Sequence, residues 1–303
     1  VQTASFVIRK SQLPNYNSQY FRLLDRDRDM KMSNYLERKN MYIAQSGRFE
    51  IIPGNPIAYW ISDRVKEAFT KPLISTRAKT LRGYATASSD KYVMKWWEVD
   101  KGNIGFDCKN NEEAYKSEKR WFPYNKGGFY RKWYGNNELI VNWENDGAEM
   151  KAYTSTLPQG SDVRLKSKEY YFKEGFTWSA LAKNVSVRYC QAGFIFDTKG
   201  SMGFPYDINL LKYYIGLINS SVSAAFLQVL APTLDFNLVS MKQIPMKIAR
   251  VAEITELVNR CIDIAKRDWD SYEVSWDFKK HPLVGEFKLL SDAYASWVKT
   301  KHN

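Results

Sequence analysis

The chain has 303 residues, 44% of them hydrophobic and 15% aromatic, and its 45 Lys and Arg against 33 Asp and Glu give a formal net charge of +12. At roughly 150 residues per domain, this length predicts about two subdomains with a sizeable core. No apolar run approaches the ~18 residues that a membrane-spanning helix needs, which excludes an integral membrane protein.

The few cysteines and histidines bear on metal binding and on the compartment. Cys108, Cys190 and Cys261 lie far apart without CxxC spacing, and His281 and His302 are the two histidines, so a zinc site is disfavoured. The odd cysteine count and the lack of a signal peptide fit a reducing cytoplasm. We expect a soluble cytoplasmic protein, and a start at Val rather than Met hints that an N-terminal portion has been removed.

The positive charge is concentrated in one part of the chain. Residues 64–132 contain 16 basic and 8 acidic side chains, so 16 − 8 = +8 of the net charge lies there. A basic segment favours polyanions, with binding that weakens as salt rises. An acidic small substrate or an anionic membrane surface would use the same field, so the charge alone does not name the partner.

The N-terminal part predicts short elements. Residues 5–9 form a strand candidate, and 49–54 predict a strand that ends in a Pro-Gly turn. Residues 62–70 have the spacing of a short helix capped by Ser62 or Asp63.

From Ser75 the sequence becomes STRAKTLRGYATASSD, and an aromatic strand is predicted over 93–99. This stretch is expected to form a phosphate-facing loop that carries Thr76, Arg77, Lys79, Thr80 and Arg82. The alternative is a solvated connector.

Residues 121–147, WFPYNKGGFYRKWYGNNELIVNWENDG, combine rings with many hydrogen-bond donors. Glycines and Asn-Asp-Gly predict turns around a strand at 139–141. The stretch carries the residue types that neutralise phosphates and pair with base edges: Lys126, Arg131, Lys132, Asn136, Asn137 and Asn142. The alternative is a strand pair whose rings are core and whose charges are solvated.

The C-terminal half changes from strands to helices. After a loop at 153–160, residues 188–190 and 194–197 predict a hairpin that turns at Gly193. Helical spacing then covers 210–229, ending near Pro232. A short run follows at 234–244, and helices are predicted over 249–267 and 283–298.

The common catalytic motifs are absent. Neither GxxxxGK[ST] nor GxGxxG occurs, and no nucleophile elbow is present. Gly54-Asn55-Pro56-Ile57 comes nearest to the Asn-Pro-Pro-aromatic motif that holds a flipped adenine, but Ile57 replaces the second proline. We interpret it as a turn.

Several phrases occur together in order: RKWYGNNELIVNWENDGAEM, YFKEGFTWSALA, VRYCQAGFIFDTKGSMGFP, YYIGLINSSVSAAFLQVLAPTLDFNLVSMKQIPM and RDWDSYEVSWDFKKHPL. Over about 47–283 they resemble the region that follows the methyltransferase domain in bacterial adenine-specific DNA methyltransferases of the PglX kind, from BREX phage-exclusion systems, and related restriction-modification methylases. In that family a class I domain binds S-adenosylmethionine and methylates adenine N6, and the region after it is the target recognition domain.

The resemblance implies a DNA-recognition fragment that holds no cofactor and is inactive alone, because the cofactor and Asn-Pro-Pro-Tyr motifs are missing. Residues 210–230, followed by Ser-Met-Lys-Gln-Ile-Pro, are also similar to the close of a target recognition domain in restriction specificity subunits. There the Ile-Pro turn leads into a spacer helix, which 249–267 would match.

We therefore expect an α+β fold without a complete Rossmann-like methyltransferase domain. Residues 1–74 would connect to the missing N-terminal methyltransferase domain, 75–245 would form the target recognition domain with a small mixed or antiparallel sheet, and 246–303 would be a helical segment. The expected partners are double-stranded DNA, the missing domain and other phage-defence subunits. A docking module for those subunits is the alternative, and an RNA binder is a second, although no RRM or KH phrase is present.

No catalytic or metal-binding residue is expected in the chain. The expected phosphate contacts are Lys79, Arg82, Lys126, Arg131, Lys132, Lys166 and Lys168. The expected base-edge contacts are Asn136, Asn137, Asn142, Lys173 and Arg188. Because the phrases that carry the resemblance would be shared by proteins that read different sites, we expect specificity in 79–95, 101–119 and 155–168.

Overall fold

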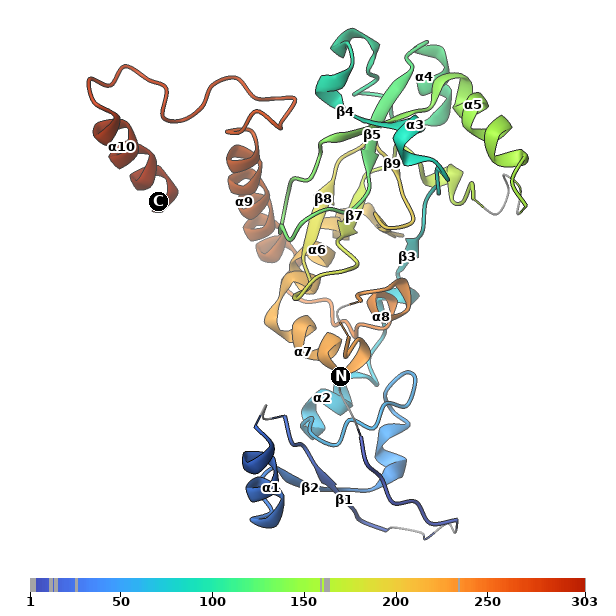
Figure 1. The fold of residues 1–303 in the computed structure, drawn as a ribbon, viewed down its shortest axis with the longest axis vertical. Coiled ribbons are helices and arrows are strands. Elements are labelled where there is room, and N and C mark those ends of the chain that lie inside the picture. The colour runs from blue at the N-terminus through green and yellow to red at the C-terminus, as the bar shows by residue number, and fades with distance from the viewer. Residues whose placement is uncertain are drawn as a thin grey trace. The chain divides into compact units, whose positions relative to one another are not determined.

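The computed structural model describes residues 4–10, 13, 16–24, 27–158, 160, 164–233 and 235–302, with the backbone alone at 300–302. The chain divides into two compact units, Val1–Pro72 and Leu73–Asn303, and Figure 1 labels most of their helices and strands. The predicted α+β class is confirmed, since helices accompany three small sheets and the described residues contain no doubly wound parallel sheet.

The first unit is a small hairpin with two helices. Strand β1 (Ser18–Phe21) pairs antiparallel with β2 (Met41–Ala44), and α1 (Arg28–Leu36) lies between them in the chain. Helix α2 (Asp63–Ala68) begins where predicted, because Ser62 Oγ accepts a hydrogen bond from the Val65 N–H.

Two strand predictions in this unit are wrong. Residues 5–9 have no regular structure, and the segment leading into 49–52 is the 3₁₀ turn η1 (Ser46–Phe49) followed by further turns. Aromatic rings pack this unit instead: Tyr20 stacks on Tyr59 with ring centroids 4.7 Å apart. The turn predicted at Gly54 is confirmed by its φ of +84°.

The second unit contains two four-stranded sheets. One is antiparallel, in the order β3 (Ala78–Leu81), β10 (Met202–Pro205), β7 (Gly175–Trp178), β8 (Val187–Cys190). The other has the order β4 (Val93–Lys95), β6 (Leu139–Asn142), β5 (Trp121–Asn125), β9 (Ile195–Phe196), with β5 and β9 parallel. The hairpin predicted from β8 to β9 is therefore wrong: the chain turns at Gly193, but the strands on either side enter different sheets.

The two sheets share one aromatic core. It includes side chains from β5, β9 and β10, namely Phe122, Tyr124, Ile195, Phe196, Met202 and Phe204. A polar link closes its edge, where Asn125 Nδ2 donates to Thr177 Oγ1 (2.7 Å) and to the Gly200 carbonyl (2.9 Å). The end of β5 is thereby fixed against β7.

The opposite face of the first sheet packs on a helix. Because side chains alternate along a strand, Phe176 and Trp178 point away from Thr177, and Phe176 stacks on Tyr214 of α6 at 5.9 Å. The single helix predicted over 210–229 is instead two, α6 (Leu211–Asn219) and α7 (Ser221–Leu230), bent by 70°. The cause is Ser220, whose Oγ caps α7 by accepting from the Ser223 N–H.

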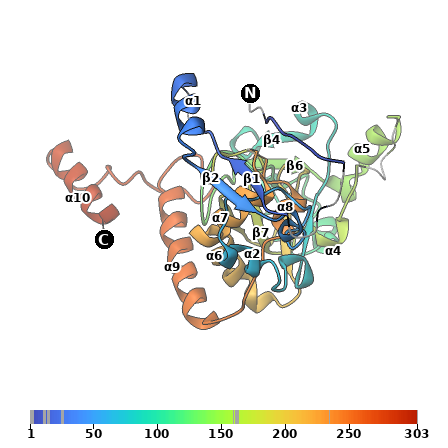
Figure 2. The same ribbon diagram turned by 90° about the horizontal axis from the view of Figure 1, so that it is seen from below.

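The remaining helices complete the second unit: α3 (Ser89–Tyr92), α4 (Asn111–Lys116), α5 (Glu144–Ser155), α8 (Leu238–Lys242), α9 (Val251–Trp269) and α10 (Leu290–His302), with short 3₁₀ turns η2 (Ile74–Thr76), η3 (Trp96–Glu98), η4 (Lys101–Asn103), η5 (Lys168–Tyr170) and η6 (Ile208–Leu210). The helix predicted over 249–267 is confirmed as α9, which lies along α6 in both views (Figure 1, Figure 2). Gly216 permits this approach, because a Cβ there would lie 2.8 Å from Val258 Cγ2.

Three other boundaries differ from the prediction. The turn predicted at Asn145, Asp146 and Gly147 is confirmed by φ values of 49°, 61° and 72°, but α5 then continues to Ser155, beyond the start of the loop predicted at 153–160. The strand predicted over 93–99 ends after β4, where η3 begins, and α10 begins at Leu290 rather than at 283. In the run predicted over 234–244, residue 234 lies outside the described residues and α8 covers the rest in part.

Within the described ranges, no single helix is long and apolar enough to cross a membrane, and the bent pair 208–219 and 221–230 meets that criterion only when its halves are joined.

Candidate nucleic-acid interface

A strip of basic side chains forms where residues 79–85, in β3 and directly after it, run beside residues 164–173. The Ala85 N–H donates to the Arg164 carbonyl (3.2 Å), and Ser167 Oγ donates to the Arg82 carbonyl (3.0 Å). Residue 82 contacts residue 167 and residue 85 contacts residue 164, so the two segments run antiparallel. Side chains that are far apart in the sequence therefore share this surface.

Tyr170 organises the strip. Lys79 Nζ lies 5.4 Å and Lys173 Nζ lies 5.0 Å from its ring centroid, and the ring itself packs on Phe204 at 4.8 Å. Both cations are exposed. Hydrogen bonding to the Tyr170 hydroxyl raises the pKa of Lys79, so this ammonium stays charged at neutral pH.

We call Lys79, Arg82, Lys166 and Lys173, together with Tyr170, the basic strip. Its four cations are exposed, and one exposed acid, Glu169, lies among them in the chain. Lys168, also predicted to contact phosphate, is engaged by the carboxylate of Asp146, which Lys151 Nζ shares at 2.6 Å. Because one carboxylate is shared by two ammonium groups, the charge of Lys168 is offset only in part.

A second feature is the loop 126–137 between β5 and β6, which a buried arginine holds. Arg188 is 1% exposed, and its guanidinium donates to the carbonyls of Gly127 and Arg131 (both 3.2 Å) and to Ser179 Oγ (3.1 Å). Burial lowers its pKa to about 10, so it remains charged at neutral pH. Among the described residues, no carboxylate lies within ion-pair distance of it.

Neighbouring groups fix the same loop further. Ser179 Oγ donates to the Gly128 carbonyl (2.9 Å), and Asn136 Nδ2 donates to the Phe129 carbonyl (2.8 Å). Gly127 and Gly128 have φ of +87° and +110°, conformations that glycine adopts without steric cost. The carbonyls of 127, 128, 129 and 131 all have hydrogen-bond donors, so the loop backbone has a defined shape.

The far end of the loop is tied to the helices. Lys132 Nζ donates to the Asn219 carbonyl (3.0 Å). Arg131 pairs with Asp268 at 3.1 Å, and its guanidinium carbon lies 5.0 Å from the ring centroid of Trp269. These contacts hold the loop against α6 and α9.

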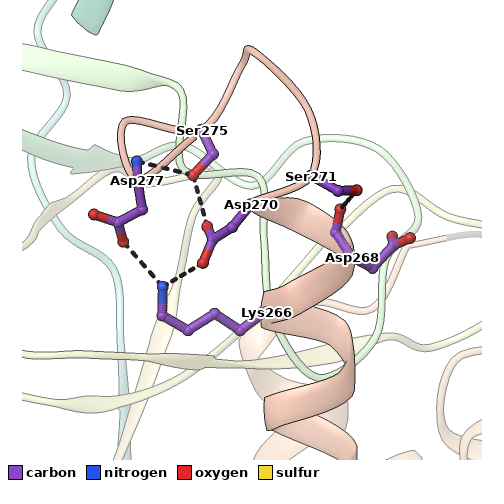
Figure 3. A network of polar contacts seen from close by, with 6 residues as sticks. All are labelled: Lys266, Asp268, Asp270, Ser271, Ser275 and Asp277. Atoms are coloured by element: carbon purple, nitrogen blue, oxygen red, sulfur yellow. Dashed lines mark hydrogen bonds and ion pairs between the residues drawn. The ribbon is translucent and has the colours of Figure 1, made fainter. Parts of the chain in front are cut away.

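The end of α9 carries a polar network (Figure 3). Lys266 Nζ donates to Asp270 (2.6 Å) and Asp277 (2.9 Å), and Ser275 Oγ donates to the other oxygen of Asp270 (2.7 Å). Burial opposes the Lys266 charge, but the two carboxylates outweigh it and raise its pKa. Lys266 Nζ also lies 5.2 Å from the Tyr134 ring centroid, which links the network to the loop.

The predicted contact residues thus fall into two groups. Lys79 and Lys173 share the Tyr170 ring, and Arg82 and Lys166 are exposed on the two segments that run side by side there. The other eight are engaged within the protein: Lys126, Arg131, Lys132, Asn136, Asn137, Asn142, Lys168 and Arg188. Arg188 and Asn142, expected to contact base edges, are both buried and make internal hydrogen bonds. Neither presents a free donor at the surface.

Two exposed aromatic rings were not predicted from the sequence as contact residues. Phe129 is 89% and Tyr130 is 55% exposed, directly after the Gly127-Gly128 pair. The pair itself was the available signal, since two positive-φ glycines turn the chain sharply before two aromatic residues. Tyr170 was also missed, because its position between two lysines depends on the fold.

Metal chemistry has no support in the parts of the chain that the structure describes, where no group of three His, Cys, Asp or Glu side chains is placed to hold an ion. Clustered Lys and Arg with an aromatic ring on a small-sheet scaffold are typical of nucleic-acid-binding surfaces. The basic strip combines these features.

The chain is similar to two adenine-specific methyltransferases. It is 33% identical to the adenine-specific methyltransferase PglX of Lacticaseibacillus casei (strain Zhang) over 312 residues, which cover 98% of this chain and 25% of that protein. It is also 33% identical to the adenine-specific methyltransferase BrxX of Escherichia coli O9:H4 (strain HS) over 303 residues, 98% of this chain and 24% of that protein. The resemblance predicted from the sequence is confirmed, and the chain spans about a quarter of the length of these curated relatives. No protein-family model matches the chain.

Proposed function

We propose that this chain recognises a short sequence in double-stranded DNA for an adenine-specific DNA methyltransferase of a phage-defence or restriction-modification system. S-adenosylmethionine binding and methyl transfer to adenine N6 belong to a domain outside this chain. Residues 75–245 form the target recognition domain, with 1–74 as the connector and 246–303 as a helical spacer. The observation that carries the proposal is the basic strip.

The basic strip supplies the contacts that position a duplex. Four exposed cations match the charge of neighbouring phosphates, and Tyr170 restrains Lys79 and Lys173 beside its ring. A restrained cation loses less entropy on binding than a freely rotating one. Base edges are then read by side chains that flank the strip, from 79–95 and from 155–168, of which residues 159 and 161–163 lie outside the described residues.

The test is a salt titration of binding to a mixed-sequence duplex. Each phosphate contact lowers log K by ~0.9 per unit of log salt, so the variant Lys79→Gln/Lys173→Gln should show a slope smaller by ~2 and weaker binding at low salt. Lys116→Gln is the matched control, because this exposed cation is already paired with Glu112 at 2.5 Å. Equal slopes for all three proteins would refute a role for the strip.

The alternative is a docking module for other defence subunits, and one feature favours it. An apolar hollow of about 400 Å³ lies between α6 and α9, and Val222 and Leu257 on its rim are 56% and 51% exposed. If a defence subunit binds the Leu257→Ser variant as tightly as the wild type, the hollow is not its docking surface. If, in addition, the chain binds no duplex at low salt, DNA recognition is contradicted as well. Loss of that complex alone, with duplex binding intact, would show two separate surfaces.

A further inference from the structure

We propose that Phe129 is a wedge that enters the base stack of the bound duplex. The inference rests on the proposed function and extends it, since it assigns a residue that distorts DNA rather than one that neutralises phosphate. It starts from the conjunction of an exposed ring and a firmly held backbone at residues 127–131.

The exposure of Phe129 is extreme for a large apolar side chain. Its ring is 89% exposed and Tyr130 beside it is 55% exposed, although the same unit buries most of its other phenylalanines in its core. A lone exposed ring on a loosely held loop would need no explanation. This loop is different, because four of its carbonyls accept hydrogen bonds from Arg188, Ser179 and Asn136.

Burial of Arg188 shows what the fold commits to this loop. A fully buried guanidinium without a carboxylate partner loses its hydration, and hydrogen bonds to neutral carbonyls restore only part of that loss. A hydrophobic residue at 188 would avoid that desolvation but would leave three acceptors without these donors. The arginine instead fixes Gly127 and Arg131, the residues on either side of the exposed rings.

The charge around the loop identifies the partner's chemistry. Three segments meet here: 126–137, 179–188, which supplies Ser179 and Arg188, and 198–201, whose Lys199 carbonyl would lie 3.1 Å from a Cβ at Gly127. Together they contain six Lys or Arg side chains, of which Arg188 is buried, and Glu138 and Asp197 directly adjoin them in the chain. Asp268, which faces the loop from α9, is paired with Arg131. An apolar tip within a positive surround fits a polyanion with a stacked interior better than it fits an apolar protein groove.

The geometry agrees with the chemistry that adenine methylation demands. An enzyme that modifies a base must take it out of the helix, and an apolar wedge placed between base steps offsets part of the unstacking cost. A wedge acts best when its backbone is already ordered, because ordering on binding would weaken affinity. The backbone around Phe129 is already ordered in the free protein by these hydrogen bonds.

The test compares a matched duplex of mixed sequence with the same duplex carrying one mismatched pair, where unstacking is cheapest. The wild-type chain should bind the mismatched duplex about tenfold more tightly, and 2-aminopurine placed beside the mismatch should brighten on binding. Phe129→Ala should abolish the preference and the brightening, leaving the salt slope unchanged, whereas Phe129→Leu should retain part of both. Tyr115→Ala, which removes an exposed ring from α4, is the control and should match the wild type.

The outcomes separate this inference from the proposed function. If Phe129→Ala keeps the wild-type preference, or the wild type has none while still binding duplex with a steep salt slope, the wedge is refuted and the basic strip stands. If the wild type binds no duplex at low salt, both fail. Because the Phe129 ring is exposed, the thermal midpoint of Phe129→Ala should equal that of the wild type, so a folding defect cannot imitate the expected result.

Discussion

Arg188→Met tests whether one buried cation sets the shape of the loop 126–137. Methionine fills much of the volume of the arginine stem but has no N–H groups. The carbonyls of Gly127 and Arg131 would lose their guanidinium donors, and Ser179 Oγ would lose a third bond. The substitution also removes a buried charge, which works in the opposite direction.

The magnitude follows from those two effects. Each buried acceptor left without a donor costs ~1–3 kcal/mol. Ser179 Oγ and the Gly127 carbonyl are buried, and the Arg131 carbonyl, which is partly buried, costs less. Removal of a charge that has no carboxylate partner among the described residues returns part of this cost. We expect a net loss of about 3 kcal/mol in the free energy of unfolding, which lowers the thermal midpoint by roughly 6–12 °C for a unit of this size. The stability of Arg188→Lys should lie between that of the wild type and that of Arg188→Met, because one ammonium cannot reach all three acceptors.

Urea denaturation followed by tryptophan fluorescence measures the change, and Lys183→Met provides the control at an exposed position nearby. Proteolysis should also cut the loop 126–137 faster in Arg188→Met than in the wild type. A variant as stable and as resistant as the wild type would refute the role assigned to this guanidinium.

Three other substitutions test the packing and the charges. Burial lowers the pKa of Lys212 to about 8, below its ordinary 10.5, so its charge destabilises the folded state, and the free energy of unfolding should rise from pH 8 to 10.5. In urea titrations, Lys212→Met should therefore be more stable than the wild type by about 1 kcal/mol at pH 7, after allowance for partial exposure of the side chain. This gain should shrink by pH 10. The raised pKa of Lys266 has the opposite effect on stability, because its charge stabilises the folded state below pH 10.5 and this stabilisation is lost as the pH rises above it. Lys266→Met should therefore lower the free energy of unfolding by about 1 kcal/mol at pH 7 and by less at pH 11. Gly83→Ala should lower the free energy of unfolding, measured by calorimetry, by about 3 kcal/mol, because its Cβ would lie 1.7 Å from the Phe196 carbonyl oxygen. A variant as stable as the wild type would contradict the close packing of residue 83 against β9.

Local signals account for the elements that the sequence predicted well. Ser62 caps α2, the apolar spacing of 249–267 forms α9, and the Asn-Asp-Gly turn follows β6 as expected. Each depends on neighbouring residues alone, which is what composition and spacing record. The break at Ser220 was also locally encoded, since a serine can end one helix and cap the next, but the continuous apolar pattern concealed it.

Elements that depend on distant partners were not predictable in this way. β9 pairs with β5 rather than with its chain neighbour β8, because the two sheets share one core. Arginine and asparagine are typical of DNA contacts, so sequence alone could not show that Arg188 and Asn142 turn inward. Conversely, Lys79 and Lys173 are far apart in the chain, and only the fold places both against Tyr170.

Selection from a pool of randomised duplexes tests the central proposal most directly. The chain would be incubated with the pool at moderate salt, and the bound duplexes recovered and sequenced over several rounds. If the chain recognises a sequence, one short motif should be enriched, and each altered base pair within it should weaken binding by ~1–3 kcal/mol. Binding that enriches no motif while remaining strongly dependent on salt would show that the chain holds DNA without reading it, and would contradict the function proposed here.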